Sequence, residues 1–223
     1  MSNSPLVNYT RISPNRNSPR NRQIDTITIH CVVGQCSVER IGEIFAPKAR
    51  QASSNYGIGF DGRIGMYVEE KDRSWCSSSP SNDHRAITIE VASDASHPYA
   101  VTDAAYKSLI NLLVDICKRN DIKKLVWSTS KADRVNHRNG CNLTVHRDYA
   151  NKSCPGDYLY SRHGAIAEEV NRRLGVGSES SLDDDLQVLV KNGVINSPAY
   201  WKAKAPTVKY LPEFIHNMAE KLR

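Results

Sequence analysis

Residues that ligate metals stand in two separate stretches of this sequence. His146 and Cys154 lie eight residues apart, across a segment that Pro155 ends. This spacing is typical of a loop rather than of one face of a helix. His30 ends a predicted strand, at the kind of sheet edge where open α/β sheets gather their active residues. A catalytic zinc site takes three protein ligands of these types and leaves one position for water.

Each of these residues also has an ordinary structural interpretation. A histidine at a strand end is more often a polar rim residue, and a cysteine before Pro-Gly is often a small buried apolar group. The other histidines show no comparable setting. His137 is the reserve candidate, because it lies in a polar loop close to His146 in the sequence. The residues alone therefore leave both interpretations open.

The elements that must position these residues follow from hydrophobic periodicity. Residues 24–30 alternate polar and apolar side chains, which predicts a strand with Ile27 and Ile29 on one face and His30 on the other. Further predicted elements are a helix from Ser37, a hairpin of strands 56–58 and 64–68, a strand over 86–91, a helix capped by Thr102, a strand over 125–127 and a helix over 164–174. This order predicts an α/β fold with a single mixed β-sheet flanked by helices.

Composition divides the chain into four parts. Residues 1–24 form a basic lead-in, which is either an extended surface segment or an arm that binds an anionic polymer. Residues 25–174 form the predicted catalytic domain, and 175–181 form a Gly-Ser linker. Residues 182–223 form a small helical C-terminal module with two helical patterns. So short a module is predicted to pack on the main domain or to dimerise.

Charge and hydropathy narrow the function classes. The 223-residue chain has a net charge of +6, which favours polyanionic partners. It has no zinc-finger spacing, RNA-binding aromatic signature or long basic helix, so nucleic acid is not an expected partner. No apolar run suits a membrane span or a secretory signal, which predicts synthesis and retention in a cytoplasm. The six cysteines are therefore expected to be free thiols or metal ligands.

Four motifs occur in the order seen in a known enzyme family. The chain resembles the type-2 N-acetylmuramoyl-L-alanine amidases over roughly residues 10–174. That family is similar to the peptidoglycan recognition proteins, and the closest resemblance is to endolysins of phages that infect Gram-positive hosts. The motifs are Ile27-Thr28-Ile29-His30, Ser53-Ser54-Asn55-Tyr56-Gly57-Ile58, Ala86-Ile87-Thr88-Ile89-Glu90, and His146-Arg147-Asp148 with Lys152-Ser153-Cys154-Pro155-Gly156.

The resemblance implies roles for five residues. Carried over by position, it makes His30, His146 and Cys154 the ligands of one zinc ion. It also implies that Glu90 shuttles a proton between zinc-bound water and the leaving amine, and that Lys152 stabilises the oxyanion. Structural alternatives for these two are a strand-end acid and a solvent-exposed loop lysine.

One position departs from the family pattern. Many relatives place a catalytic tyrosine seven residues before the aspartate of the Asp-Gly hairpin. Counting back from Asp61 gives Ser54, while Tyr56 lies two residues further on. The tyrosine role is therefore not transferred to Tyr56, which is expected to belong to the core or to a groove wall.

The resemblance as a whole implies a zinc-dependent peptidoglycan hydrolase. It would cleave the amide between N-acetylmuramic acid and L-alanine as a phage or prophage endolysin, reaching the cell wall after release. Its partners would be peptidoglycan and anionic wall polymers, with no nucleic acid or membrane, and the C-terminal module would bind the wall or form a homodimer. The alternatives are a non-catalytic peptidoglycan-binding receptor, which the presence of Cys154 disfavours, and a host autolysin or recycling amidase.

Overall fold

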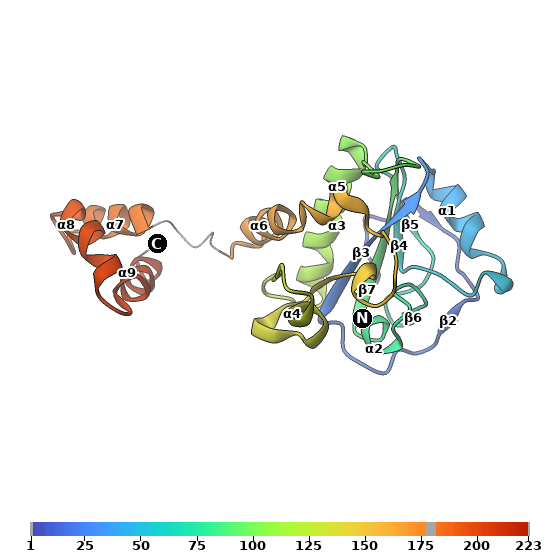
Figure 1. The fold of residues 1–223 in the computed structure, drawn as a ribbon, viewed down its shortest axis with the longest axis horizontal. Coiled ribbons are helices and arrows are strands. Elements are labelled where there is room, and N and C mark those ends of the chain that lie inside the picture. The colour runs from blue at the N-terminus through green and yellow to red at the C-terminus, as the bar shows by residue number, and fades with distance from the viewer. Residues whose placement is uncertain (1, 177–181, 223) are drawn as a thin grey trace. The chain divides into compact units, whose positions relative to one another are not determined.

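The computed structural model describes residues 2–176 and 182–222. The chain divides into two compact units between Leu174 and Gly175, and each unit has its own hydrophobic core (Figure 1). No helix in these described ranges is long and apolar enough to cross a membrane.

A six-stranded mixed sheet forms the centre of the first unit, which confirms the predicted sheet flanked by helices (Figure 1). Neighbouring strands are parallel except for the β4–β5 hairpin. Their order across the sheet is β1 (Tyr9–Thr10), β5 (Ile64–Met66), β4 (Tyr56–Ile58), β7 (Ala86–Ser93), β3 (Thr26–Val33) and β8 (Leu143–Val145). A separate antiparallel ribbon joins β2 (Arg16–Asn17) to β6 (Arg73–Ser74).

The helices begin where the sequence supplies caps. The side chains of Ser37 and Thr102 accept hydrogen bonds from backbone amides in the first turns of α1 and α3, and the capping role was predicted for Thr102. The helices of the first unit are α1 (Val38–Phe45), α2 (Pro80–Asp83), α3 (Asp103–Arg119), α4 (Lys131–Asn136), α5 (Gly156–Tyr160) and α6 (His163–Leu174). Three 3₁₀ turns, η1 (Lys48–Arg50), η2 (Arg138–Gly140) and η3 (His146–Asp148), complete it.

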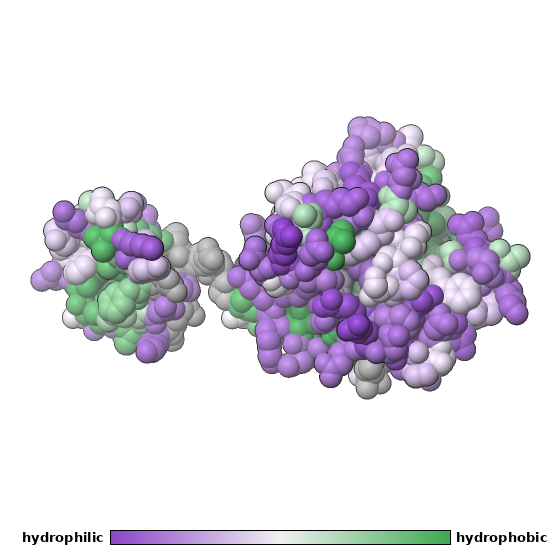
Figure 2. All heavy atoms as spheres, turned by 60° about the horizontal axis from the view of Figure 1, so that its bottom comes forward, coloured by the Kyte–Doolittle hydropathy of each residue, from purple (hydrophilic) through white to green (hydrophobic). Residues whose placement is uncertain are grey.

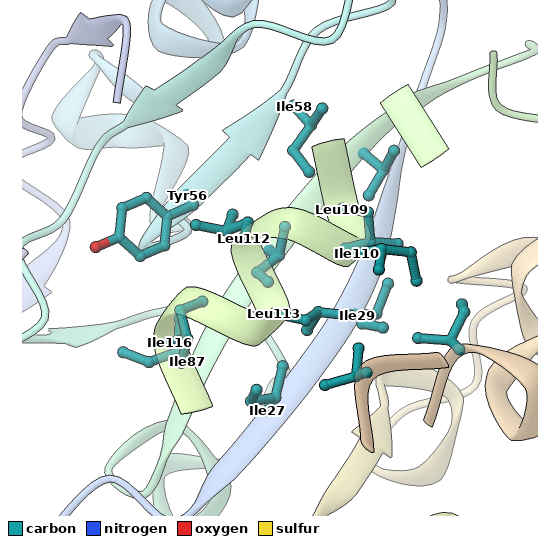
Figure 3. Packing of buried hydrophobic residues seen from close by; sticks show 14 of the residues in the cluster. Ile27, Ile29, Tyr56, Ile58, Ile87, Leu109, Ile110, Leu112, Leu113 and Ile116 are labelled. Carbon is teal, nitrogen blue, oxygen red and sulfur yellow. The ribbon is translucent and has the colours of Figure 1, made fainter. Parts of the chain in front are cut away.

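The two faces of the sheet differ in chemistry. Figure 3 shows Ile27 and Ile29 of β3 packed with the leucines of α3, and α3 in turn contacts α6. On the opposite face, the hydroxyl of Thr28 bonds the hydroxyl of Thr144 of β8 at 2.8 Å. Alternation along each strand therefore separates an apolar core from a buried polar layer.

The predicted strand over 125–127 is wrong. The backbone amide of Leu125 donates to the side chain of Asn171, and that of Val126 donates to the side chain of Asn142, each at 2.8 Å. Side chains thus replace the ladder partner that a strand needs. The strand at this edge is β8, which pairs with β3.

The N-terminal lead-in is built into the first unit. It contributes β1 and β2, and the guanidinium of Arg20 is buried. Arg20 donates to the backbone oxygens of Glu70 and Asp72 at 2.6 and 2.9 Å, and burial lowers its pKa to about 10. Arg20 of the basic lead-in is therefore enclosed by the fold and cannot face a polymer.

The described part of the second unit contains three helices, where two helical patterns were predicted. They are α7 (Leu182–Lys191), α8 (Pro198–Lys204) and α9 (Leu211–Glu220), with a 3₁₀ turn η4 (Ala205–Thr207). Leu186, Leu189 and Ile215 are buried in its core. Apolar side chains also gather on its surface (Figure 2), where Tyr200 and Phe214 are 55% and 58% exposed. The predicted linker lies mostly outside the described residues.

A buried ion pair fixes the turn that carries His146. Arg134 of α4 and Asp148 of η3 form two hydrogen bonds of 2.7 and 2.6 Å, and their side chains are 2% and 1% exposed. Arg134 also donates to the backbone oxygen of Ser128 and stacks 4.5 Å from the ring centre of Trp127. The pair therefore ties η3 to the α4 segment.

We predict that Asp148→Ala lowers the free energy of unfolding by about 3–5 kcal/mol, because it leaves the Arg134 charge buried without its partner. Asp25→Ala removes the partner of Arg85 in a largely exposed pair and should cost about 1 kcal/mol or less. Urea unfolding of both variants measures the difference. Equal losses of unfolding free energy would show that burial of the Arg134–Asp148 pair adds no stability.

Candidate metal centre

His30 lies in the middle of β3, on the buried polar face of the sheet. Its side chain is fully buried, and in the parallel ladder it lies opposite Glu90 of β7. The sequence places it there because His30 is in phase with Thr26 and Thr28, whereas Ile27 and Ile29 enter the core. Strand periodicity alone thus determines which way the imidazole points.

His146 and Cys154 belong to one short loop. His146 follows β8 directly, and Cys154 precedes α5. The amide of Arg147 donates to the backbone oxygen of Cys154 at 3.1 Å, and the Arg147 side chain donates to the backbone oxygen of Ser153. These bonds bring the two ends of the loop together.

The structure brings His30, His146 and Cys154 into one cluster. Their ligand atoms all lie within 4.8 Å of one another. Cys154 Sγ lies 3.5 Å from His30 Nδ1, and the two imidazole ring centres are 5.0 Å apart. The other contacts of the cluster are weak, such as the one between Ser78 Oγ and His146 Nε2 at 3.3 Å.

The protonation states of these three residues are compatible with binding of a cation. Burial lowers the pKa of His30, and the charge of protonated His146 lowers it further. Burial and the charge of Lys152 lower the pKa of His146, so both shifts favour the neutral imidazole that a metal binds. A hydrogen bond with Cys31 and burial raise the pKa of Cys154, a shift that a cation would reverse. Two imidazoles and one thiolate match the donor set of a catalytic zinc.

Glu90 and Cys76 lie beside this cluster. Cys76 Sγ contacts Glu90 Oε1 at 3.8 Å, while Glu90 Oε2 is buried and lacks a partner among the described residues. Burial raises the pKa of Glu90 to about 7. Sequence reasoning missed Cys76, since neither its spacing nor its neighbours distinguish it from the other cysteines. All six cysteines are free in this structure.

The remaining candidates take different places. Lys152 is exposed on the loop before Cys154, where its positive charge lowers the pKa of His146. The reserve candidate His137 is outside the donor cluster, and its Nδ1 contacts the backbone oxygen of Cys141 at 3.0 Å. Tyr56 is fully buried and donates its hydroxyl proton to Glu70 at 2.6 Å, so its side chain belongs to the interior.

A family model described as N-acetylmuramoyl-L-alanine amidase matches residues 20–157, which is more than half of the chain. This chain belongs to the N-acetylmuramoyl-L-alanine amidase family. The matched segment contains the three clustered donors and Glu90. Among curated proteins, no match to this amidase-family chain is found.

Solved structures share the fold of this family member. A selenomethionine derivative of AmpD superposes with a TM-score of 0.55 at 19% identity, covering 74% of this chain and 96% of AmpD. PlyL gives a TM-score of 0.54 at 14% identity, covering 73% and 95%. A mutant endolysin from Bacillus subtilis gives 0.52 at 18% identity, covering 74% and 99%. At these identities the likeness establishes the fold alone.

Proposed function

We propose that this amidase is a zinc-dependent peptidoglycan hydrolase that cleaves the amide between N-acetylmuramic acid and L-alanine, and that it acts as a phage or prophage endolysin. One observation carries the proposal. His30, His146 and Cys154 come from two distant stretches of the chain and meet with a donor set suited to zinc. The family membership of the segment that contains them supports the choice of substrate.

The three donors would hold one zinc ion and leave its fourth position free. Zinc in such a site polarises a carbonyl and lowers the pKa of bound water. Arg147 assists by holding the ends of the loop together, so that His146 and Cys154 are presented to His30 as a pair. The buried position of His30 excludes bulk water from its side of the site.

Glu90 is suited to carry a proton. Its carboxyl group is buried, and its pKa of about 7 allows it both to accept and to release a proton near neutral pH. Oε2 has no hydrogen-bond partner among the described residues, so it is the oxygen available for this transfer. Glu90 would take a proton from the attacking water and deliver it to the leaving amine.

Lys152 would stabilise the negative charge that develops on the scissile carbonyl oxygen. Its exposed ammonium acts on His146 electrostatically, which indicates that the charge reaches the site. A preorganised cation at a developing oxyanion lowers the barrier because the charge interaction strengthens in the transition state.

Two rival functions use the same fold. A non-catalytic peptidoglycan receptor has no need of a thiolate donor, and the clustering of Cys154 with two imidazoles favours the enzyme. A host autolysin or recycling amidase would perform the same chemistry. Analysis of muropeptides from digested walls separates the first rival, since an amidase releases new N-terminal alanine without new reducing sugar ends.

The second unit is proposed to attach the enzyme to the wall. Tyr200 and Tyr210 are exposed, and the ammonium of Lys209 lies 4.8 Å from the ring centre of Tyr210. Exposed aromatic rings beside cations suit sugar rings and anionic wall polymers. A homodimer formed through the exposed apolar surface is the alternative.

We predict that Cys154→Ser binds less zinc and loses wall hydrolysis, because serine is a poor replacement for a thiolate ligand. Metal analysis after dialysis and clearing of purified walls are the measurements. Cys36→Ser, which changes a half-buried cysteine outside the donor cluster, is the matched control and should retain both properties. Wild-type enzyme that is active without any transition metal would contradict the mechanism.

Glu90→Gln should reduce turnover by about two orders of magnitude or more, since the amide keeps the shape of the side chain but cannot accept the proton. Zinc content and sedimentation with walls should be unchanged. Glu39→Gln, at a half-buried position of α1 outside the donor cluster, controls for the loss of one negative charge. If Glu90→Gln clears walls at nearly the wild-type rate, Glu90 has only a structural role.

A chain ending at Leu174 should still hydrolyse purified peptidoglycan, because the first unit contains every residue assigned to chemistry. The full chain should lyse intact cells faster, since a second contact raises the effective concentration of enzyme at the wall. Light scattering and wall pull-down of both chains test attachment against dimerisation. A monomeric full chain whose truncation changes neither wall binding nor lysis would refute both roles.

A further inference from the structure

A second set of metal donors shares His30 with the first. Cys76, Glu90 and His30 also offer ligand atoms that all lie within 4.8 Å of one another. The set is held in place from two sides. Glu90 is fixed by the β3–β7 ladder, and the backbone amide of Cys76 donates to Asp83 of α2 at 3.0 Å.

Two atoms of this set are buried without partners. His30 Nε2 and Glu90 Oε2 make no hydrogen bond with the described residues, although buried polar atoms normally do. An ion bound by Cys154 and by His30 through Nδ1, the nitrogen 3.5 Å from Cys154 Sγ, would leave both of these atoms unsatisfied. Cys76 Sγ thus lies within 4.8 Å of a donor atom of His30 and of Glu90, and each of these two side chains has a buried atom without a partner among the described residues.

We propose that Cys76, Glu90 and His30 bind a second zinc ion when zinc is in excess, and that this ion inhibits the enzyme. The inference rests on the proposed function, in which the first ion is the catalytic one. Thiolate, carboxylate and imidazole are all ligands that zinc accepts. Both ions bind at once when the His30 imidazole loses its remaining ring proton to solvent and, as imidazolate, offers one nitrogen to each ion.

Inhibition follows from the role of Glu90. A carboxylate that coordinates an ion cannot take the proton of the attacking water. Binding of the second ion should also be weaker than that of the first, because the first positive charge opposes the second across a buried site. Inhibition therefore begins only above the zinc concentration that fills the catalytic position.

Metal stoichiometry of the full chain tests the inference directly. Metal-free protein is titrated with zinc, and bound metal is measured by equilibrium dialysis. Wild type and Cys36→Ser should bind one ion and then a second, whereas Cys76→Ala and Cys76→Ser should stop at one. Wild type that stops at one, or Cys76→Ala that binds two, overturns the inference. Wild type that binds no zinc at all would instead refute the proposed function.

Cobalt provides a spectroscopic readout that does not depend on activity. In Cys154→Ser, a thiolate-to-cobalt charge-transfer band should still form, and it should vanish in the double variant Cys76→Ala/Cys154→Ser. A band that persists in the double variant assigns the ligand to another thiol and overturns the inference.

The inhibitory role is tested with each variant normalised to its own maximal rate of wall clearing. Excess zinc should reduce the wild-type rate about a hundredfold, in line with the loss of a general base. The rates of Cys76→Ala and Cys76→Ser should stay near their maxima. If excess zinc lowers the rates of wild type and of both variants to a similar extent, the inhibitory role is overturned.

Discussion

Parallel pairing between β3 and β7 determines both the core and the donor cluster. The two strands pair over eight residues each, from Thr26 opposite Ala86 to Val33 opposite Ser93. In this register Ile29 and Ile89 enter the apolar core together, while His30 and Glu90 face the polar layer. A shift of the register by one residue would exchange the faces and bury the donors among leucines.

The polar layer is stable because its members bond one another. Asn82 donates to Thr28 at 2.9 Å and receives the hydroxyl proton of Tyr149 at 2.9 Å, and Thr88 shares a hydrogen bond of 2.7 Å with Ser74. Such bonds offset the cost of removing these groups from water. The buried donor atoms of His30 and Glu90 lack this compensation, which marks them as groups kept for a ligand.

Sequence patterns predicted the elements that have an extended hydrophobic periodicity or a capping residue close by in the sequence. The hairpin around Asp61 and the helix after Thr102 form where they were predicted. The strand with His30 also forms, but it continues to Val33 instead of ending at His30. Residues 125–127 misled the prediction, because their apolar character suggests a strand while the backbone amides of Leu125 and Val126 donate to the side chains of Asn171 and Asn142.

Prediction of the site was limited for the same reason, because contacts between segments far apart in the sequence leave no local pattern. His30, His146 and Cys154 were found through residue chemistry and motif order. Cys76 was missed because it approaches Glu90 only through the fold, in a segment whose backbone is bonded by Asp83. Burial of Arg20 was missed for a similar reason, since its partners are backbone oxygens some 50 residues away and leave no trace in composition.

Placement of His146 directly after β8 has a consequence for the order in which fold and metal site form. A bond through a metal between His30 and His146 would close a chain loop of 116 residues, which is costly in entropy for an unfolded chain. Here β8 already pairs with β3, with Val145 opposite Ile29, so folding closes that loop beforehand. The ion would bind to a preformed site, and loss of the ion would leave the sheet intact. A zinc finger, by contrast, unfolds without its metal.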